Sequence, residues 1–180
     1  MTGYRIGNQF AAHFITFAVV EWVDVFTRQD YSKIVIKSLA HCQKEKGLEI
    51  FAWCLMSNHI HLIVRSTTGD LSGTLRDFKK FTSKAIIKAI NENQTESRRN
   101  WMLWIFKSAG EKNSRNQTYQ FWQQNNHPKE LLSNKFIDQK IDYIHNNPIE
   151  AGIVENAEDY LYSSAKDYTG LDGLLEIEFM

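Results

Sequence analysis

Two histidines placed two residues apart are the side chains of this sequence that are best placed to do chemistry together. His59 and His61 lie in the segment 57–64, which otherwise reads as a buried strand. Side chains alternate between the faces of a strand, so we expect Ile60 and Leu62 on one face and both imidazoles on the other. Two neighbouring imidazoles can share a divalent metal ion, but the same spacing also suits ordinary surface or hydrogen-bonded histidines. A second segment has to decide between these interpretations.

That segment is 142–148, where Tyr143 and Asn147 are four residues apart and so share one face of a helix. The amide oxygen of Asn147 can be a third metal ligand, and tyrosine is a side chain able to act as a covalent nucleophile. A free tyrosine hydroxyl has a pKa of about 10, so it needs a metal that polarises the scissile phosphate. Without the histidine pair, packing and helix capping would explain Tyr143 and Asn147. His145 is expected to point elsewhere.

Composition limits the class of protein. The 180 residues are 43% hydrophobic and 13% aromatic, which is enough to fill the core of one domain. Cys42 and Cys54 lack metal-motif spacing, so they are expected to be small core residues of a protein in a reducing compartment. The apolar stretch 14–25 is too short and too interrupted by acids to span a bilayer. We therefore expect a soluble cytoplasmic protein that does not contact a membrane.

The formal net charge is zero, but the charges are unevenly distributed. Residues 76–115 hold ten basic against four acidic residues, a net charge of plus six, whereas residues 148–180 have a net charge of minus seven. A neutral average can therefore conceal a basic face suited to a polyanion, although a basic stretch is also typical of a solvated helix surface.

The elements that must position the site follow from apolar periodicity and turn residues. Strands are expected over residues 13–22, 48–56, 59–65 and 119–124, with a tight turn at Ser57 and Asn58 joining the middle two. Helices are expected from a cap at Asp30 to Gly47, over residues 71–90, around residues 101–106 with Gly110 just past the end, and over residues 136–147, stopped by Pro148. This order predicts one α+β domain over residues 1–180, with a ferredoxin-like antiparallel sheet, two helices on one face and the last helix carrying the tyrosine.

The combination of these motifs resembles a known family. It comprises His59-Ile60-His61, Asp142-Tyr143-Ile144, Asn147-Pro148, Ala151-Gly152-Ile153-Val154 and Tyr160 with Ser163-Ser164. Their order and spacing are similar to those of the single-tyrosine HUH transposases, specifically the REP-associated tyrosine transposase branch, over about residues 13–168. Gly110, Asn113-Ser114 and Phe121-Trp122-Gln123 also resemble this branch.

The resemblance implies a metal-dependent transposase acting on single-stranded or hairpin DNA. Tyr143 would attack a phosphodiester and leave a 5'-phosphotyrosine bond and a free 3'-hydroxyl, with His59, His61 and Asn147 as metal ligands. Rejoining exchanges one phosphoester for another, in agreement with the absence of a Gly-rich nucleotide-binding loop motif. The family implies Mg²⁺ or Mn²⁺, whereas two imidazoles suit zinc, nickel or copper equally well. Monomer and homodimer both remain open.

DNA could be held by a basic stripe on the helix expected over residues 71–90. The stripe repeats every four residues and consists of Arg76, Lys80, Lys84 and Lys88, with Lys79 beside it. Trp101, Trp104 and Trp122 could stack on unpaired bases, but their spacing favours packing in the core.

Two other functions compete with the transposase. A catalytically inactive DNA-binding or regulatory protein could keep the same fold, but it would not need His59, His61 and Tyr143. A phosphodiesterase in which water attacks would keep the histidines and dispense with the tyrosine.

Overall fold

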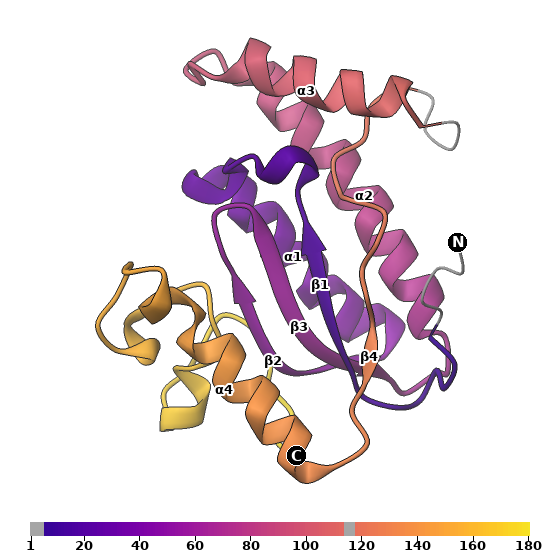
Figure 1. Ribbon diagram of the computed structural model, residues 1–180, viewed down its shortest axis with the longest axis vertical. Helices are drawn as coiled ribbons and strands as arrows, with labels where there is room; N and C mark the ends of the chain where they lie inside the picture. Colours follow the sequence, from indigo (N-terminus) through magenta and orange to yellow (C-terminus); the bar gives the residue numbers. More distant parts are fainter. Residues whose placement is uncertain (1–5, 114–117) are drawn as a thin grey trace.

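The computed structural model describes residues 6–113 and 118–180. Its central element is a four-stranded antiparallel sheet (Figure 1). The strand order is β2-β3-β1-β4, the order of a ferredoxin-like sheet, so the predicted fold class is confirmed. The strands are β1 (His13–Ala18), β2 (Leu48–Leu55), β3 (His59–Ser66) and β4 (Lys129–Glu130). The histidine strand β3 is therefore central, flanked by its hairpin partner β2 and by β1.

The two faces of the sheet are covered by different helices. Ile60, Leu62 and Val64 pack into the larger core, whose other side is formed by α1 (Gln29–Lys46) and α2 (Leu71–Glu92). The opposite face packs against α4 (Asn134–Glu150), which is drawn in orange beside β2 in Figure 1. The expected alternation along β3 is confirmed, and it turns both histidines toward α4.

Helix boundaries agree with the sequence at one end of α1 and differ at the other. Gly47 ends α1 in the left-handed conformation (φ +63°), as its lack of a Cβ allows. The prediction that Asp30 caps the helix was wrong, because α1 begins at Gln29 and Asp30 lies in its first turn. An acid there still faces the positive end of the helix dipole.

The helix α3 (Arg99–Glu111) runs past the residue expected to stop it. Gly110 lies inside α3, where an added Cβ would come within 2.8 Å of the backbone oxygen of Thr118. Gly110 is therefore needed for a close approach between the helix and the following segment, and its interpretation as a helix stop was wrong.

The expected strand over residues 119–124 is also wrong. β4 lies further along the chain and pairs with His13 and Phe14, whereas Trp122 makes only an isolated bridge with Val19. The first strand ends early, at Ala18, because Val20–Trp22 form a 3-10 turn. The aromatic residues of 119–124 are suited to a strand, but here they fill the core beside that turn.

The helix α4 begins with a side-chain cap and continues through a proline. Ser133 Oγ accepts a hydrogen bond from the amide of Phe136 (3.3 Å). The prediction that the helix stops at Asn147 was wrong, because Pro148 is accommodated and α4 ends at Glu150. A proline this close to the end removes a single hydrogen bond of the last turn.

The described C-terminal segment returns to the sheet beside β2. Ser163 bridges to Cys54, and the hydroxyl of Tyr160 donates to the backbone oxygen of Leu55 (2.8 Å). Cys42 and Cys54 are both buried in the core, as expected, and neither forms a disulfide within the described residues. Within residues 6–113 and 118–180, no helix has the length and apolar character needed to cross a membrane.

Candidate active site

The two histidines of β3 lie side by side, and the tyrosine of α4 lies against one of them. The ring centroids of His59 and His61 are 4.7 Å apart, and the Tyr143 ring is 5.3 Å from the His61 ring in an edge-to-face arrangement. Tyr143 is 42% exposed although it contacts the sheet. The sequence-predicted residues His59, His61 and Tyr143 are thus brought together, with the phenol accessible from solvent.

His61 is buried, and one of its two ring nitrogens makes a hydrogen bond. Its Nδ1 shares a hydrogen bond with Thr16 Oγ1 on β1 (2.7 Å), and Phe14 stacks on its ring (5.5 Å). Its Nε2 is buried and has no hydrogen-bond partner among the residues that the structure describes. An unpaired buried polar atom costs about 1–3 kcal/mol. The Nε2 atom of His61 is therefore suited to binding something that the protein chain does not supply.

His59 is oriented by a chain of polar groups that the sequence reasoning missed. Its Nδ1–H donates to Asn58 Oδ1 (2.7 Å), because a carboxamide oxygen can only accept. The Asn58 amide in turn donates to Asp24 Oδ1 (3.0 Å) and to the backbone oxygen of Trp22 (3.3 Å). This chain fixes the tautomer of His59 and leaves the Nε2 lone pair of the imidazole available. Such outer partners are typical of histidines that bind metal ions.

Burial keeps both imidazoles neutral. It lowers the pKa of His59 below its usual value. It also lowers the pKa of His61 to about 3, and charge on His59 and Lys140 adds to this effect. Neutral imidazoles offer a lone pair to a metal ion, so the pair fits a divalent cation at neutral pH.

Lys140 brings a positive charge to the tyrosine. Its Nζ lies 5.2 Å from the centre of the Tyr143 ring and 4.7 Å from that of Phe14. Burial lowers the pKa of Lys140, and the charge of Lys129 lowers it further. A cation here can attract a phosphate and stabilise a negatively charged oxygen. The sequence contained one indication that Lys140 lies near Tyr143, because residues three apart share one face of a helix.

Asn147 lies one turn beyond Tyr143 on α4 and is half-buried. No group of three His, Cys, Asp or Glu side chains gathers anywhere in the described part of the chain. A metal ion on the histidine pair would therefore take its other ligands from amide, hydroxyl or substrate oxygens, and Asn147 offers an amide oxygen one helical turn from Tyr143.

His145 lies outside this cluster, as expected. It is buried on the side of α4 that faces the C-terminal segment, where its Nε2 and Ser164 Oγ share a hydrogen bond (2.8 Å). Burial lowers the pKa of His145 to about 4, so it is neutral as well.

The basic stripe lies on α2, across the sheet from the histidines. Its exposed members are Arg76, Lys80, Lys84 and Lys88. Lys79 differs, because its ammonium group donates to the backbone oxygen of Gln123 (2.9 Å) and to Asn126 Oδ1 (2.7 Å). Burial lowers the pKa of Lys79 to about 8. Lys79 thus fixes the segment that follows Trp122.

The tryptophans separate into two groups. Trp122 is buried and its indole N–H donates to Thr82 Oγ1 (2.9 Å), which confirms the packing interpretation for this residue. That interpretation was wrong for Trp101 and Trp104, which are exposed on α3. Of the other residues that resembled the transposase branch, Ser114 lies outside the described residues.

Two solved structures are similar to this chain. The chain shares its fold with a solved structure described as a REP-associated tyrosine transposase bound to a REP hairpin, with a TM-score of 0.63 and 19% identity over 99% of this chain and 92% of that one. A protein assigned as a transposase from Deinococcus radiodurans R1 is also similar, with a TM-score of 0.44 and 16% identity over 81% of this chain and 97% of that one. No curated protein matched the chain.

The family model described as "Transposase IS200 like" matches residues 8–107, more than half of the sequence. The chain therefore belongs to the IS200-like transposase family, and it is a DNA transposase by family. The resemblance found in the sequence is confirmed, for the family by this match and for the fold by the REP-associated structure.

Proposed function

We propose that this transposase cleaves and rejoins single-stranded DNA by transesterification at hairpin-forming repeats, with Tyr143 as the nucleophile and residues 1–180 acting as one domain. The observation that carries the proposal is the contact between Tyr143 and His61, whose buried Nε2 is unpaired within the described chain. Hairpin DNA as the substrate is supported by the solved protein of the same fold, which is bound to a REP hairpin.

The Tyr143 hydroxyl would attack the phosphorus of one phosphodiester. The phenolic O–H bond and the bond from phosphorus to the 3'-oxygen break, and a bond from phosphorus to the phenolic oxygen forms. The departing 3'-oxygen takes up a proton, and the 5'-phosphate stays on Tyr143. Attack by a 3'-hydroxyl reverses these changes, so no nucleotide cofactor is consumed.

His59, His61 and Asn147 would hold a divalent cation, for which we propose Mg²⁺ or Mn²⁺. When bound, such a cation polarises the phosphate and stabilises the charge that develops on its oxygens. The protein itself supplies the orientation of both imidazoles through Thr16 and Asn58, and a positive charge beside the phenol from Lys140.

The strand itself would be bound by phosphate contacts to the basic stripe Arg76, Lys80, Lys84 and Lys88, which is exposed along α2. We infer a supporting part for Lys79, whose ammonium group already binds Gln123 and Asn126.

The test is a covalent-adduct assay with end-labelled hairpin DNA carrying a single-stranded extension, in Mn²⁺, resolved on a denaturing gel. The wild type should form a protein–DNA adduct, and Tyr143→Phe should not. Tyr168→Phe is the matched control, because Tyr168 is nearly as exposed and its hydroxyl binds the backbone of β2 instead. Cleavage that survives Tyr143→Phe would favour attack by water. DNA binding without any cleavage by the wild type would favour the regulatory protein.

A further inference from the structure

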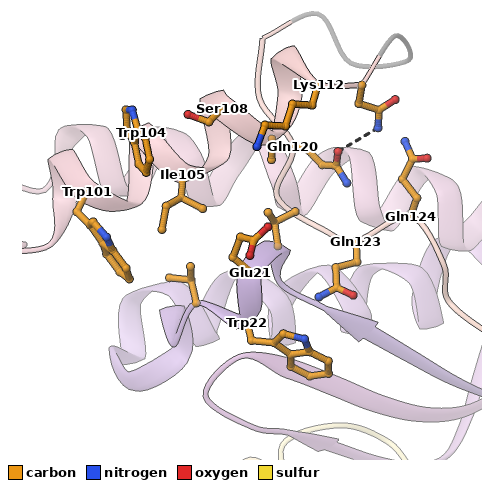
Figure 2. Close-up of a pocket in the computed structure, with 14 residues that line it drawn as sticks. Glu21, Trp22, Trp101, Trp104, Ile105, Ser108, Lys112, Gln120, Gln123 and Gln124 are labelled. Atoms are coloured by element: carbon orange, nitrogen blue, oxygen red, sulfur yellow. Dashed lines mark hydrogen bonds between the residues drawn. The ribbon is translucent and has the colours of Figure 1, made fainter.

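An open groove of about 1020 Å³ lies next to the histidine pair, between α3, the turn Val20–Trp22 and the segment 120–124 (Figure 2). Its walls include Trp22, Trp101, Trp104, Gln120, Gln123 and Gln124. This volume is at the upper end of the range of small-molecule sites, so the groove can hold more than one aromatic ring. No residue of the candidate active site lines it.

The tryptophans of the groove are exposed to an unusual degree. Trp22, Trp101 and Trp104 are 54%, 52% and 66% exposed. Figure 2 shows Trp101 and Trp104 on α3 and Trp22 on the opposite side of the groove. Exposed indoles gathered around one hollow are typical of a binding surface, because large apolar side chains otherwise pack into the core.

The backbone that presents Trp22 is strained. Glu21 and Trp22 both have left-handed backbone angles (φ +52° and +54°), which non-glycine residues rarely adopt, least of all in succession. The conformation is held by the Val20 amide, which donates to the backbone oxygen of Phe121 (2.8 Å), and by the Asn58 amide, which donates to that of Trp22 (3.3 Å). Strain of this kind persists where the surrounding structure enforces it and is concentrated at functional sites.

The same turn connects the groove to the histidine pair. The Trp22 ring meets the His59 ring edge to face, with centroids 5.7 Å apart. Asn58 binds both His59 and the backbone of Trp22, so one side chain positions both. A strand whose phosphodiester lies at His59 would therefore enter the groove beside Trp22.

The chemistry of the lining suits bases more than phosphates. Glu21 and Lys112 offset each other in charge, and the remaining polar groups are neutral amides, a hydroxyl and the indole N–H groups. Aromatic faces with amide donors and acceptors match the faces and edges of unpaired bases. Beyond Gln120 and Gln124 a second groove of about 400 Å³ begins, which is lined by Lys80 and Lys84 of the basic stripe. Positive charge thus follows where the backbone of the same strand would continue.

We propose that this groove binds unpaired bases of the DNA strand, with Trp22 stacking on the base next to the histidine pair and Trp101 on a base further along. The proposal rests on the proposed function, because it takes the cleaved strand as the occupant. It adds a base-binding site to the cleavage site and assigns single-stranded DNA, rather than duplex, to this face.

The test measures binding without cleavage. Fluorescence anisotropy is recorded in EDTA with two labelled DNAs, a blunt hairpin and the same hairpin carrying an unpaired extension. Loss of a stacked base is expected to weaken binding of the extended hairpin by roughly 5- to 150-fold in Trp101→Ala and to leave the blunt hairpin unaffected. Trp101→Phe should restore most of the affinity, because phenylalanine still stacks. Phe81→Ala is the control, since Phe81 is an equally prominent aromatic (62% exposed) over a different cavity, between α1 and α2.

If wild type and Trp101→Ala bind the extended hairpin with equal affinity, the proposal is overturned. The exposed indoles would then be assigned to binding of a protein partner. Equal weakening on both hairpins would also overturn it, because the effect would not depend on unpaired bases. Tyr143→Phe separates the two claims. An adduct that still forms in the Tyr143→Phe variant would show that Tyr143 is not the nucleophile. The anisotropy measurement does not depend on that result, because it reports only on DNA binding by the groove.

Discussion

The Tyr143 ring on α4 meets the edge of the His61 imidazole on β3 at a centroid distance of 5.3 Å, and both residues belong to one chain. Ile137, Ile141 and Ile144 fix α4 on the histidine face of the sheet, so the contact depends on a packed helix. The proposed nucleophile and one of the proposed metal ligands therefore meet within a single protomer.

This arrangement predicts catalysis in cis. Tyr143→Phe and His61→Gln, each inactive alone, are expected to remain inactive when mixed at equal concentration, because neither chain carries both groups. The measurement is adduct formation in the mixture. Recovery of activity would show that the tyrosine comes from a partner subunit, and circular dichroism of each variant establishes that both are folded.

Asn58 is expected to act on metal binding through His59. Asn58→Ala removes the acceptor that fixes the His59 tautomer and should weaken Mn²⁺ binding by about 10- to 100-fold, the usual effect of losing such a partner. Isothermal titration calorimetry measures this directly. Asn91→Ala, at an exposed position of α2, is the control. Unchanged affinity in Asn58→Ala would mean that the cation does not bind through His59.

Glu96 is expected to stabilise the fold and to make that stability depend on pH. Its buried carboxylate is bound by Arg28 (2.6 Å) and by Arg98 (3.1 Å), which link α1 to the start of α3. Breaking a buried ion pair on one side costs about 3 kcal/mol, which corresponds to roughly 6–12 °C in the melting temperature. Glu96→Gln should lower the free energy of unfolding by this amount at pH 7. Glu92→Gln, which removes an exposed ion pair with Lys88, should lower it by under about 1 kcal/mol.

The pH dependence follows from the same contacts. Burial raises the pKa of Glu96, but the hydrogen bonds and charges of Arg98 and Arg28 outweigh it and hold the pKa below the ordinary 4.5. The folded protein thus binds the proton less readily than the unfolded chain, so the stabilisation is complete above pH 4.5 and disappears as pH falls through the folded-state pKa. Denaturant titrations of wild type and Glu96→Gln should converge in acid. A difference in unfolding free energy between the two proteins that stays constant down to pH 3 would contradict this.

The basic stripe on α2 is expected to set the salt dependence of DNA binding. Reversing Lys80 and Lys84 to glutamate should weaken binding and reduce the slope of log affinity against log salt by about 0.7 for each phosphate of single-stranded DNA that the protein no longer neutralises. Reversal of Lys33 and Lys37, which are exposed on α1, is the matched control. A slope that does not change in the α2 variant would exclude phosphate binding there.

The sequence pattern was sufficient to predict features that depend on a single strand or helix. The period of two in β3 placed His59 and His61 on one face, and the apolar spacing of α4 placed its inner side against the sheet. The ferredoxin-like fold class followed from the succession of elements, although the last strand was expected at residues 119–124 and lies at Lys129–Glu130. These features depend on neighbours in sequence, which is why they could be predicted.

Relationships across the chain could not be predicted in this way. Nothing next to Asn58 in sequence indicates that Asp24 lies beside it, although this contact orients His59. The apolar spacing of Trp101 suggested a packed face, because sequence shows that a residue is apolar and not whether a neighbour covers it. Phe121 and Trp122 suit a strand, yet tertiary packing holds them in an irregular segment.

The most direct test of the central claim is to identify the residue that becomes attached to DNA. After reaction with hairpin DNA in Mn²⁺, nuclease and protease digestion followed by mass spectrometry should find a nucleotide 5'-phosphate on the peptide that contains Tyr143. A modification on another residue, or a cleaved strand with a free 5'-phosphate and unmodified protein, would contradict the account.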